Sequence, residues 1–193
     1  MAITRLGGAN AITGTLPAAN INSTSLGNVD VGKVLQVVSA FKNDNFSTTS
    51  TSFTDITDLT LNITPTSSSN KILILGHAAV SCSLDDRNAN LKIRKVIGAT
   101  TTDVGVAETV GSTIATSAGG HLPYVSGGQN VATYNIAFQY LDSPNTTNQI
   151  TYKLSVQVIS GTTVHIGRSA DFNSTDSNRS TFPSAISVME VSA

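Results

Sequence analysis

Two neighbouring runs of the chain, residues 131–140 and 150–159, alternate between apolar and polar positions. The apolar positions are Ala132, Tyr134, Ile136, Phe138 and Tyr140 in the first run and Ile150, Tyr152, Leu154, Val156 and Val158 in the second. Side chains on a strand point to opposite faces with a period of two, so each run predicts a strand with one buried face. The link between them is rich in Asp, Asn, Ser and Pro, which favour turns. The pattern therefore predicts a long antiparallel hairpin.

Other segments also have the character of strands, and none has the 3.6-residue period of a helix. The unbroken apolar run at 71–75 predicts a strand that is covered on both faces. Many short strands with turn residues between them indicate an all-β protein, either a sandwich or a barrel. Further strands are predicted at residues 33–41, 59–63, 91–94, 164–166 and 185–191.

Residues 98–130 consist mainly of Gly, Ala, Ser and Thr, and their few aliphatic side chains are the expected attachments to the core. One or two strands are predicted here, with long loops around Gly119-Gly120 and Gly127-Gly128. Long loops of a compact β domain often contact partners. The residues expected to attach this segment to the core are Val104, Val106, Val110 and Ile114.

Residues 1–32 differ from the rest, because they combine Gly, Ala, Asn and Thr with scattered apolar residues and keep neither period. Such a segment cannot build its own core, so we expect it to dock on neighbouring subunits or on another protein. We therefore divide the chain into an extended N-terminal anchoring arm at 1–32 and a β head at 33–193. The candidate anchoring residues of the arm are Ile3, Leu6, Ile12, Leu16, Ile21 and Leu26.

The composition limits the partners that we expect. Only 12% of the residues are charged and the formal net charge is −1, so nothing indicates nucleic-acid binding or attraction to an anionic membrane. No apolar run is long enough to insert into a bilayer, and the first residues lack the apolar stretch of a secretory signal, so we expect synthesis in a cytoplasm. Cys82 is the only cysteine, and we expect it to be a small buried apolar residue.

Catalytic patterns are weak. His77 and His165 lie in apolar strand contexts typical of structural histidines, whereas His121 follows two glycines and is the histidine that we expect to be exposed. No Gly-x-Ser-x-Gly motif activates a serine. The adjacent carboxylates Asp85 and Asp86 would point to opposite faces of a regular strand and would not converge on one glycosidic bond.

Metal and cofactor motifs are equally weak. Residues 86–90 resemble the start of a calcium loop, but they lack the turn glycine and the bidentate glutamate, so a polar turn is favoured. Residues 171–178 contain many side-chain oxygens and are most typical of a surface loop between the last two strands. No zinc or phosphate motif occurs. We therefore predict no enzymatic activity, no metal and no cofactor.

The four tyrosines are most of the large amphipathic residues in a chain with 5% aromatic residues and no tryptophan. Small proteins with few core aromatics often gain stability from subunit contacts, and tyrosine is enriched at interfaces. Alternating tyrosines are equally common in the core of a β-sandwich, so core and interface both remain open. The tyrosines are Tyr124, Tyr134, Tyr140 and Tyr152.

Four segments, at residues 1–21, 62–74, 140–147 and 186–191, resemble the short fibre-like virion proteins of bacteriophages, especially phages of aquatic bacteria. The resemblance implies a homotrimer with an antiparallel jelly-roll β-sandwich head, similar to heads of the C1q/TNF class. It also implies an N-terminal arm that binds other virion proteins, and a head that faces outward on the virion surface. The chain departs from long tail fibres in having no shaft.

Two functions fit this resemblance. The chain is either a tail fibre or spike that attaches to a glycan or protein of the host surface, or a decoration protein that stabilises the capsid or tail. A carbohydrate-active enzyme is disfavoured because no convergent acid pair is present. The candidate contact residues lie in the Gly-rich segment and in the Asn/Asp-rich loop, and they are His121, Tyr124, Asp171, Asn173 and Asp176.

Overall fold

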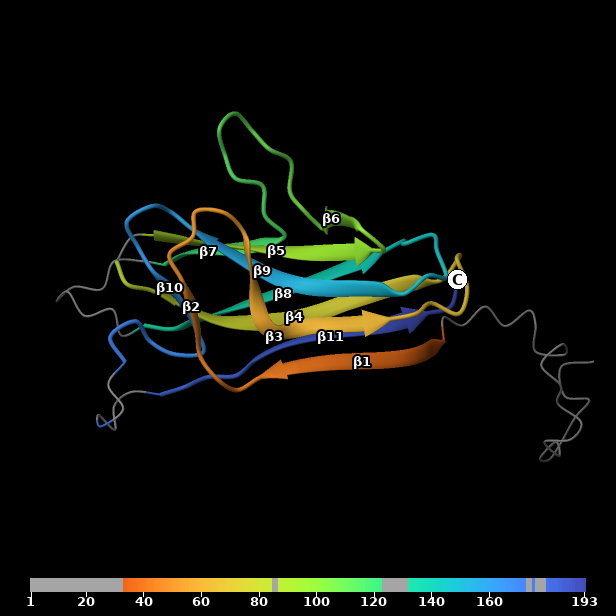
Figure 1. Cartoon of the computed structure of the whole chain (residues 1–193), viewed down its shortest axis with the longest axis horizontal. Coiled ribbons are helices and arrows are strands. Elements are labelled where there is room, and N and C mark those ends of the chain that lie inside the picture. Colours follow the sequence, from red (N-terminus) through yellow and green to blue (C-terminus); the bar gives the residue numbers. More distant parts are fainter. Residues whose placement is uncertain (1–32, 85–86, 123–131, 173–174, 176–179) are drawn as a thin grey trace, which may run out of the picture. The chain divides into compact units, whose positions relative to one another are not determined.

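The computed structural model describes residues 33–84, 87–122, 132–172, 175 and 180–193. In these residues it contains strands and no helix, and the strands form two antiparallel sheets packed as a sandwich (Figure 1). The predicted all-β fold is therefore confirmed. The anchoring residues predicted in the arm lie outside the described residues. The strands are β1 (Val34–Lys42), β2 (Phe46–Thr48), β3 (Thr54–Ile63), β4 (Lys71–Cys82), β5 (Arg87–Ile97), β6 (Thr100–Val104), β7 (Ala118–Leu122), β8 (Tyr134–Asp142), β9 (Ile150–Val158), β10 (Val164–Ile166) and β11 (Ser184–Val191).

The strand order identifies the sandwich as a jelly roll. One sheet, here called sheet A, has the order β1-β11-β4-β8, with β10 and β2 beside the second half of β4. The other, sheet B, has the order β3-β9-β5, with β6 and β7 following each other along the far side of β5. Thus β1 pairs with β11, β3 with β9, β4 with β8 and β5 with β7, so the first half of the chain pairs with the second half in reverse order. An antiparallel ribbon of this kind, rolled around a core, is a jelly roll.

The predicted hairpin between the two alternating runs is wrong. β8 pairs with β4 in sheet A, whereas β9 pairs with β3 and β5 in sheet B. The alternation correctly predicts which face of each strand is buried, because both apolar faces contribute to the same core. It does not predict the neighbouring strand. The turn-rich segment between the two strands therefore crosses from one sheet to the other.

The tyrosines in the described part of the chain belong to this core. Tyr152 is fully buried, and its hydroxyl donates a hydrogen bond of 2.6 Å to Asp142 Oδ2. Tyr134 and Tyr140 are half-buried and pack against the core cluster. These three side chains favour the core interpretation over a subunit contact, and Tyr124 lies outside the described residues.

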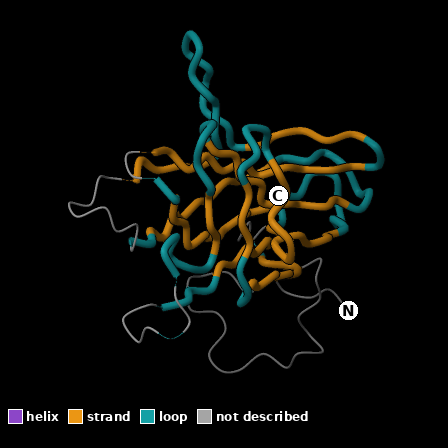
Figure 2. Tube along the Cα trace, turned by 60° about the vertical axis from the view of Figure 1, so that its left-hand side comes forward, coloured by secondary structure: helices purple, strands orange, loops and turns teal. Residues whose placement is uncertain are grey.

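The segment with few apolar residues contains two strands, β6 and β7, as predicted. The predicted loop at Gly119-Gly120 is wrong, because both residues lie in β7, which pairs with β5. A Cβ atom at Gly119 would lie 3.0 Å from the carbonyl oxygen of Ala89, so glycine allows this edge strand to approach β5 closely. Of the predicted attachments to the core, only Val104 is buried. The other three lie on the connection 105–117, which projects from the sandwich (Figures 1 and 2).

Candidate functional site

The outer face of sheet A carries a row of apolar side chains that crosses four strands. Leu141 of β8 pairs with Leu73 of β4, Leu73 pairs with Met189 of β11, and Met189 pairs with Val37 of β1. Residues directly opposite each other on antiparallel strands have Cβ atoms about 5 Å apart, so the four side chains form one continuous apolar surface. We call the outward-facing side of β1, β11, β4 and β8 the apolar face.

The apolar face is most exposed at its edge strand, β1. Phe41 is 61% exposed, Val37 54% and Leu35 45%, and at the other side of the sheet Leu141 is 53% exposed. With about 200 Å² for an aromatic side chain, Phe41 alone leaves roughly 120 Å² of apolar area in contact with water, and the three aliphatic side chains add to it. The largest apolar patch of a typical monomer covers about 300–600 Å² and is often functional, so the apolar face is a candidate interaction site.

The strand predicted to be covered on both faces is covered on only one. Ile72 and Ile74 are fully buried in the sandwich, whereas Leu73 and Leu75 on the opposite side of β4 are only partly buried. An unbroken apolar strand is typical of sheets that are packed on both faces. Within the described residues the second covering layer is missing, and the apolar face is the surface that it would cover.

The outer face of sheet B has the opposite character, because its side chains pair their charges with each other. The carboxylate of Asp55 lies 3.2 Å from Arg94 Nη1 and 3.1 Å from Lys153 Nζ. Asp103 lies 2.6 Å from Lys92 Nζ and 3.7 Å from Arg94 Nε. Ion pairs of this kind contribute little to stability at a surface, but they keep a surface hydrated. Sheet B therefore presents more charge to water than sheet A does.

The connection between β6 and β7 is a second exposed apolar feature, and we call residues 105–117 the projecting loop. It rises from the sandwich beside the end of β6 (Figures 1 and 2). Val110 is 70% exposed near its tip, and Ile114 and Val106 are 44% and 36% exposed. Its one charged side chain is Glu108, and it contains no aromatic residue. Its surface therefore combines aliphatic side chains with hydroxyl groups and one carboxylate.

Hydrogen bonds hold the projecting loop in one shape. At the tip, the amide of Thr113 donates to the carbonyl of Val110 at 3.1 Å, and the amide of Val110 donates to Thr113 Oγ1 at 3.0 Å. At the base, Ser117 Oγ donates to the carbonyl of Val104 at 2.7 Å and accepts from the amide of Ile93 at 2.9 Å. A loop that is already ordered loses less entropy on binding than a flexible one.

The base of the projecting loop also depends on a glycine. Gly105 has a φ of +62°, a conformation that side chains of L-residues rarely adopt. A Cβ atom at this position would lie 2.9 Å from the ring of Tyr140. The glycine therefore lets the chain leave β6 against an aromatic ring of the core.

The buried carboxylate of Glu190 is held by donors on two other segments. Its Oε2 accepts from Gln36 Nε2 at 2.6 Å, and its Oε1 accepts from Asn70 Nδ2 at 2.6 Å and from the amide and hydroxyl of Thr66 at 2.7 and 2.8 Å. Burial favours a higher pKa, but these hydrogen bonds outweigh it and lower the pKa of Glu190 to about 2. The carboxylate thus joins β1, β11 and the segment before β4, which is a structural role.

Two further buried ionisable groups have structural partners. The carboxylate of Asp142 accepts the Tyr152 hydroxyl and lies 3.0 Å from Lys95 Nζ, which links the end of β8 to β9 and β5. The fully buried amine of Lys42 lies 2.5 Å from the carboxylate of Asp44 and 3.6 Å from that of Asp58. Asp142 therefore connects β8 of sheet A to two strands of sheet B, and Lys42 connects the end of β1 to two nearby carboxylates.

The candidate contact residues are not brought together as one site by the described residues. His121 lies in β7, where its Nδ1 is 2.9 Å from Asn88 Oδ1, and it is exposed as predicted. Asp171 is half-buried in the turn after β10. Tyr124, Asn173 and Asp176 lie outside the described residues. A contact role for these five residues stays a prediction, whereas sequence reasoning missed the projecting loop, whose aliphatic residues it assigned to the core.

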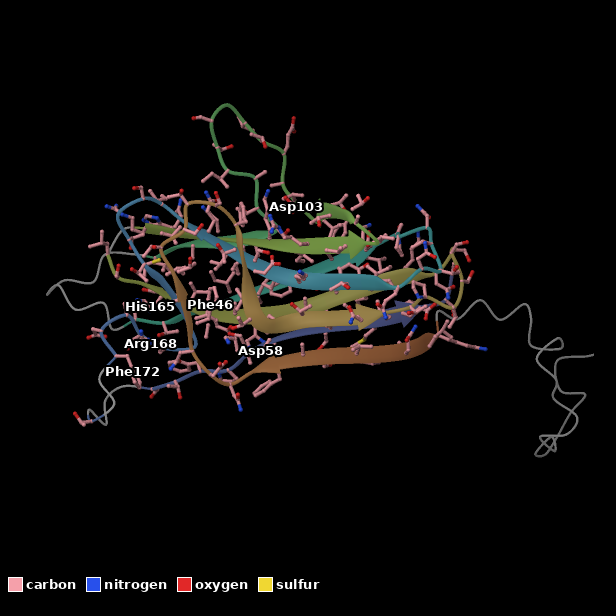
Figure 3. The ribbon with its side chains drawn as sticks, viewed as in Figure 1. Phe46, Asp58, Asp103, His165, Arg168 and Phe172 are labelled. Carbon is pink, nitrogen blue, oxygen red and sulfur yellow. The ribbon has the colours of Figure 1, made fainter. Side chains whose placement is uncertain are left out.

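A third group of side chains lies near the predicted Asn/Asp-rich loop, at one end of the sandwich (Figure 3). His165 is buried in β10, as predicted for a structural histidine, and its Nδ1 is 3.3 Å from Arg168 Nη2. Burial, and then the charge of Arg168, lower the pKa of His165. The guanidinium carbon of Arg168 also lies 5.7 Å from the centre of the Phe172 ring. Arg168 therefore contacts both β10 and Phe172.

Two features bear on small ligands. A cavity of about 230 Å³ opens on the outer side of sheet A and is lined mainly by apolar groups. The cavity is lined by His77, Ala79, Thr133, Asn135, Phe182 and Pro183. In the described part of the chain, no group of three or more acidic, histidine or cysteine side chains could hold a metal ion.

The same described residues contain no helix that is long and apolar enough to cross a membrane.

Comparison with known proteins leaves the family open. No family model matches the chain, and no curated protein matches it. Among solved structures, a chain in the structure of infectious bursal disease virus, Gt strain, is similar to this chain. The TM-score is 0.42 and the sequence identity is 13%, and the alignment covers 84% of this chain and 40% of the viral chain. The Gx strain gives 0.41 and 15% over the same shares, and the VP2 subviral particle of this virus gives 0.40 and 13% over 81% and 39%. The chain thus spans about two fifths of these structures. A likeness of this degree does not indicate shared function, so the jelly-roll assignment rests on the strand pairing alone.

Proposed function

We propose that this chain is a structural virion protein of a bacteriophage, a trimeric tail fibre or spike that displays its β head for host attachment. Residues 1–32 form the arm that binds other virion proteins, and residues 33–193 form the head. The alternative within the same class is a decoration protein that stabilises the particle.

One observation supports assembly more than any other: the contrast between the two sheet surfaces. Sheet B carries paired charges outward, whereas sheet A carries exposed leucine, valine and phenylalanine. Exposed apolar faces of this kind are often functional, and oligomers cover such faces at their interfaces. The resemblance of four segments to fibre-like phage proteins supplies the phage and virion part of the proposal.

The mass of the full-length chain in solution tests assembly. We expect three copies of the 19.9 kDa chain by light scattering or sedimentation. Val37→Asp, which places a charge in the apolar row, should shift the mass toward a monomer. Thr101→Asp is the matched control, because Thr101 is exposed on the outer side of β6 in sheet B. A monomeric wild-type chain would contradict the trimer.

The position of the protein in the particle separates attachment from decoration. Labelling of intact phage with an antibody to the head should mark a few positions at the tail. Labelling across the whole capsid would instead support decoration. Purified full-length protein should also compete with phage for adsorption to host cells, and undiminished adsorption at saturating protein would count against attachment.

A further inference from the structure

We infer that the projecting loop of one copy docks on the apolar face of the next copy, so that the trimer closes through head-to-tail contacts. This inference rests on the proposed trimer. It identifies the two surfaces that meet in each contact, which trimerisation alone does not determine. The occupant of the apolar face is thus a second copy of this chain.

The symmetry of a ring requires two different surfaces on each copy. In a cyclic trimer every contact joins one patch of a subunit to a different patch of its neighbour, unlike the self-complementary patch of a twofold dimer. Among the described residues, the exposed large apolar side chains gather mainly in two places, the β1 side of the apolar face and the projecting loop. These are the two surfaces that such a contact needs.

The β1 side of the apolar face and the projecting loop lie at opposite edges of the sandwich. β1 is the edge strand of sheet A and packs over β3, the edge strand of sheet B. The projecting loop joins β6 and β7, which lie at the other edge of sheet B, where β7 packs against β8. Figure 1 shows β1 at one side of the sandwich and the loop at the other. Surfaces on opposite edges meet between copies and cannot meet within one copy.

The chemistry of the two surfaces matches. The projecting loop presents Val106, Val110 and Ile114, and the apolar face presents aliphatic side chains and one phenylalanine. The only charge of the loop is the exposed carboxylate of Glu108, whereas the charged side chains at the start of β1 and β4 are the cations Lys33 and Lys71. A loop without aromatic or cationic groups cannot stack on a sugar ring or neutralise a phosphate, and its three exposed aliphatic side chains can pack on an apolar protein surface.

The loop is also ready to dock without rearrangement. Hydrogen bonds fix both its tip and its base, and Val110 at the tip is the most exposed of the loop's large apolar side chains. A preformed loop keeps most of the free energy that its contacts supply. We therefore expect Val110 to contribute strongly to the contact.

Cysteine pairs test the contact directly, and the chain suits this experiment because its single cysteine, Cys82, is buried. Full-length protein with both Val37→Cys and Val110→Cys should form disulfides between chains under mild oxidation, up to a covalently closed trimer. Each single variant alone should stay monomeric in a denaturing gel. Efficient cross-linking of Val37→Cys alone would indicate a face-to-face contact and would overturn the inference.

A charge at the tip gives the second test. Val110→Asp should raise the dissociation constant of the trimer at least about tenfold, because it removes an apolar contact and buries a charge. Thr101→Asp is the control, and circular dichroism should show both variants folded. A trimer that is unchanged by Val110→Asp and forms no 37–110 disulfide would overturn the inference and leave the trimer intact. A wild-type monomer would instead overturn the trimer itself.

Discussion

Replacement of Glu190 by glutamine should destabilise the fold in a pH-dependent way. The groups that face the Glu190 carboxylate are all donors: Gln36 Nε2, Asn70 Nδ2, and the amide and hydroxyl of Thr66. A glutamine at this position must turn its own NH₂ group toward at least one of these donors. The variant therefore loses the charge and at least one hydrogen bond, and it keeps the shape of the side chain.

The expected loss in the free energy of unfolding follows from the lowered pKa of Glu190. Glu190 titrates near 2 in the folded protein and at an ordinary value of 4.5 when it is unperturbed. Each unit of difference corresponds to about 1.4 kcal/mol, and relaxation around the site reduces the total, so we expect the ionised carboxylate to contribute about 2 kcal/mol. Because the folded-state pKa is the lower one, this stability is present above pH 4.5 and is lost as the pH falls toward 2.

Urea unfolding of wild type and Glu190→Gln at pH 7, 4 and 3, at one protein concentration, measures the effect. The free energies of unfolding should differ by about 2 kcal/mol at pH 7, and the difference should shrink at pH 4 and 3. Glu108→Gln is the matched control, because Glu108 is exposed on the projecting loop, and its effect should be within about 0.5 kcal/mol. A difference between wild type and Glu190→Gln that stays constant from pH 7 to 3 would refute this account of the carboxylate.

Three other changes have defined outcomes. Tyr152→Phe should lower the free energy of unfolding by about 1–2 kcal/mol, because Asp142 loses a buried donor; an unchanged urea midpoint would argue against the bond. Gly105→Ala should cost about 1–3 kcal/mol more than Gly98→Ala, since both have positive φ but only Gly105 lacks room for a Cβ; equal melting temperatures would contradict this. Cys82, whose thiol pKa burial raises to about 11, should react with thiol reagents only in denaturant, and rapid labelling of the native protein would show that it is accessible.

The alternation of apolar and polar residues predicts the buried faces well and the strand partners poorly. Ile136 and Phe138 of β8 and Leu154 of β9 are buried as the pattern predicts, yet their strands lie in different sheets. A period of two records only which side of a strand meets the core. Pairing depends on the path of the whole chain, and a connection rich in turn residues can bridge two sheets as readily as two neighbouring strands.

Segments without clear periodicity were predicted least well, for a physical reason. The aliphatic residues Val106, Val110 and Ile114 look like attachments to a core in a stretch of small residues, but the structure exposes all three. Sequence patterns assume that apolar side chains are buried within their own chain, and this assumption fails in the projecting loop. The contacts of Glu190 could not be predicted from the sequence either, because they join residues up to 154 positions apart.

The pairing of the first head strand with the last affects how the head is made. Among the described residues, β1 pairs in sheet A with β11 alone, and hydrogen-bonded residues of the two strands lie up to 154 positions apart. At about 5–20 residues per second, a ribosome needs on the order of 10–30 seconds to deliver the partner after β1 has emerged. During that time one side of β1 offers unpaired backbone groups, and its leucine, valines and phenylalanine are exposed. The unpaired apolar strand β1 therefore carries a risk of aggregation until β11 has been synthesised.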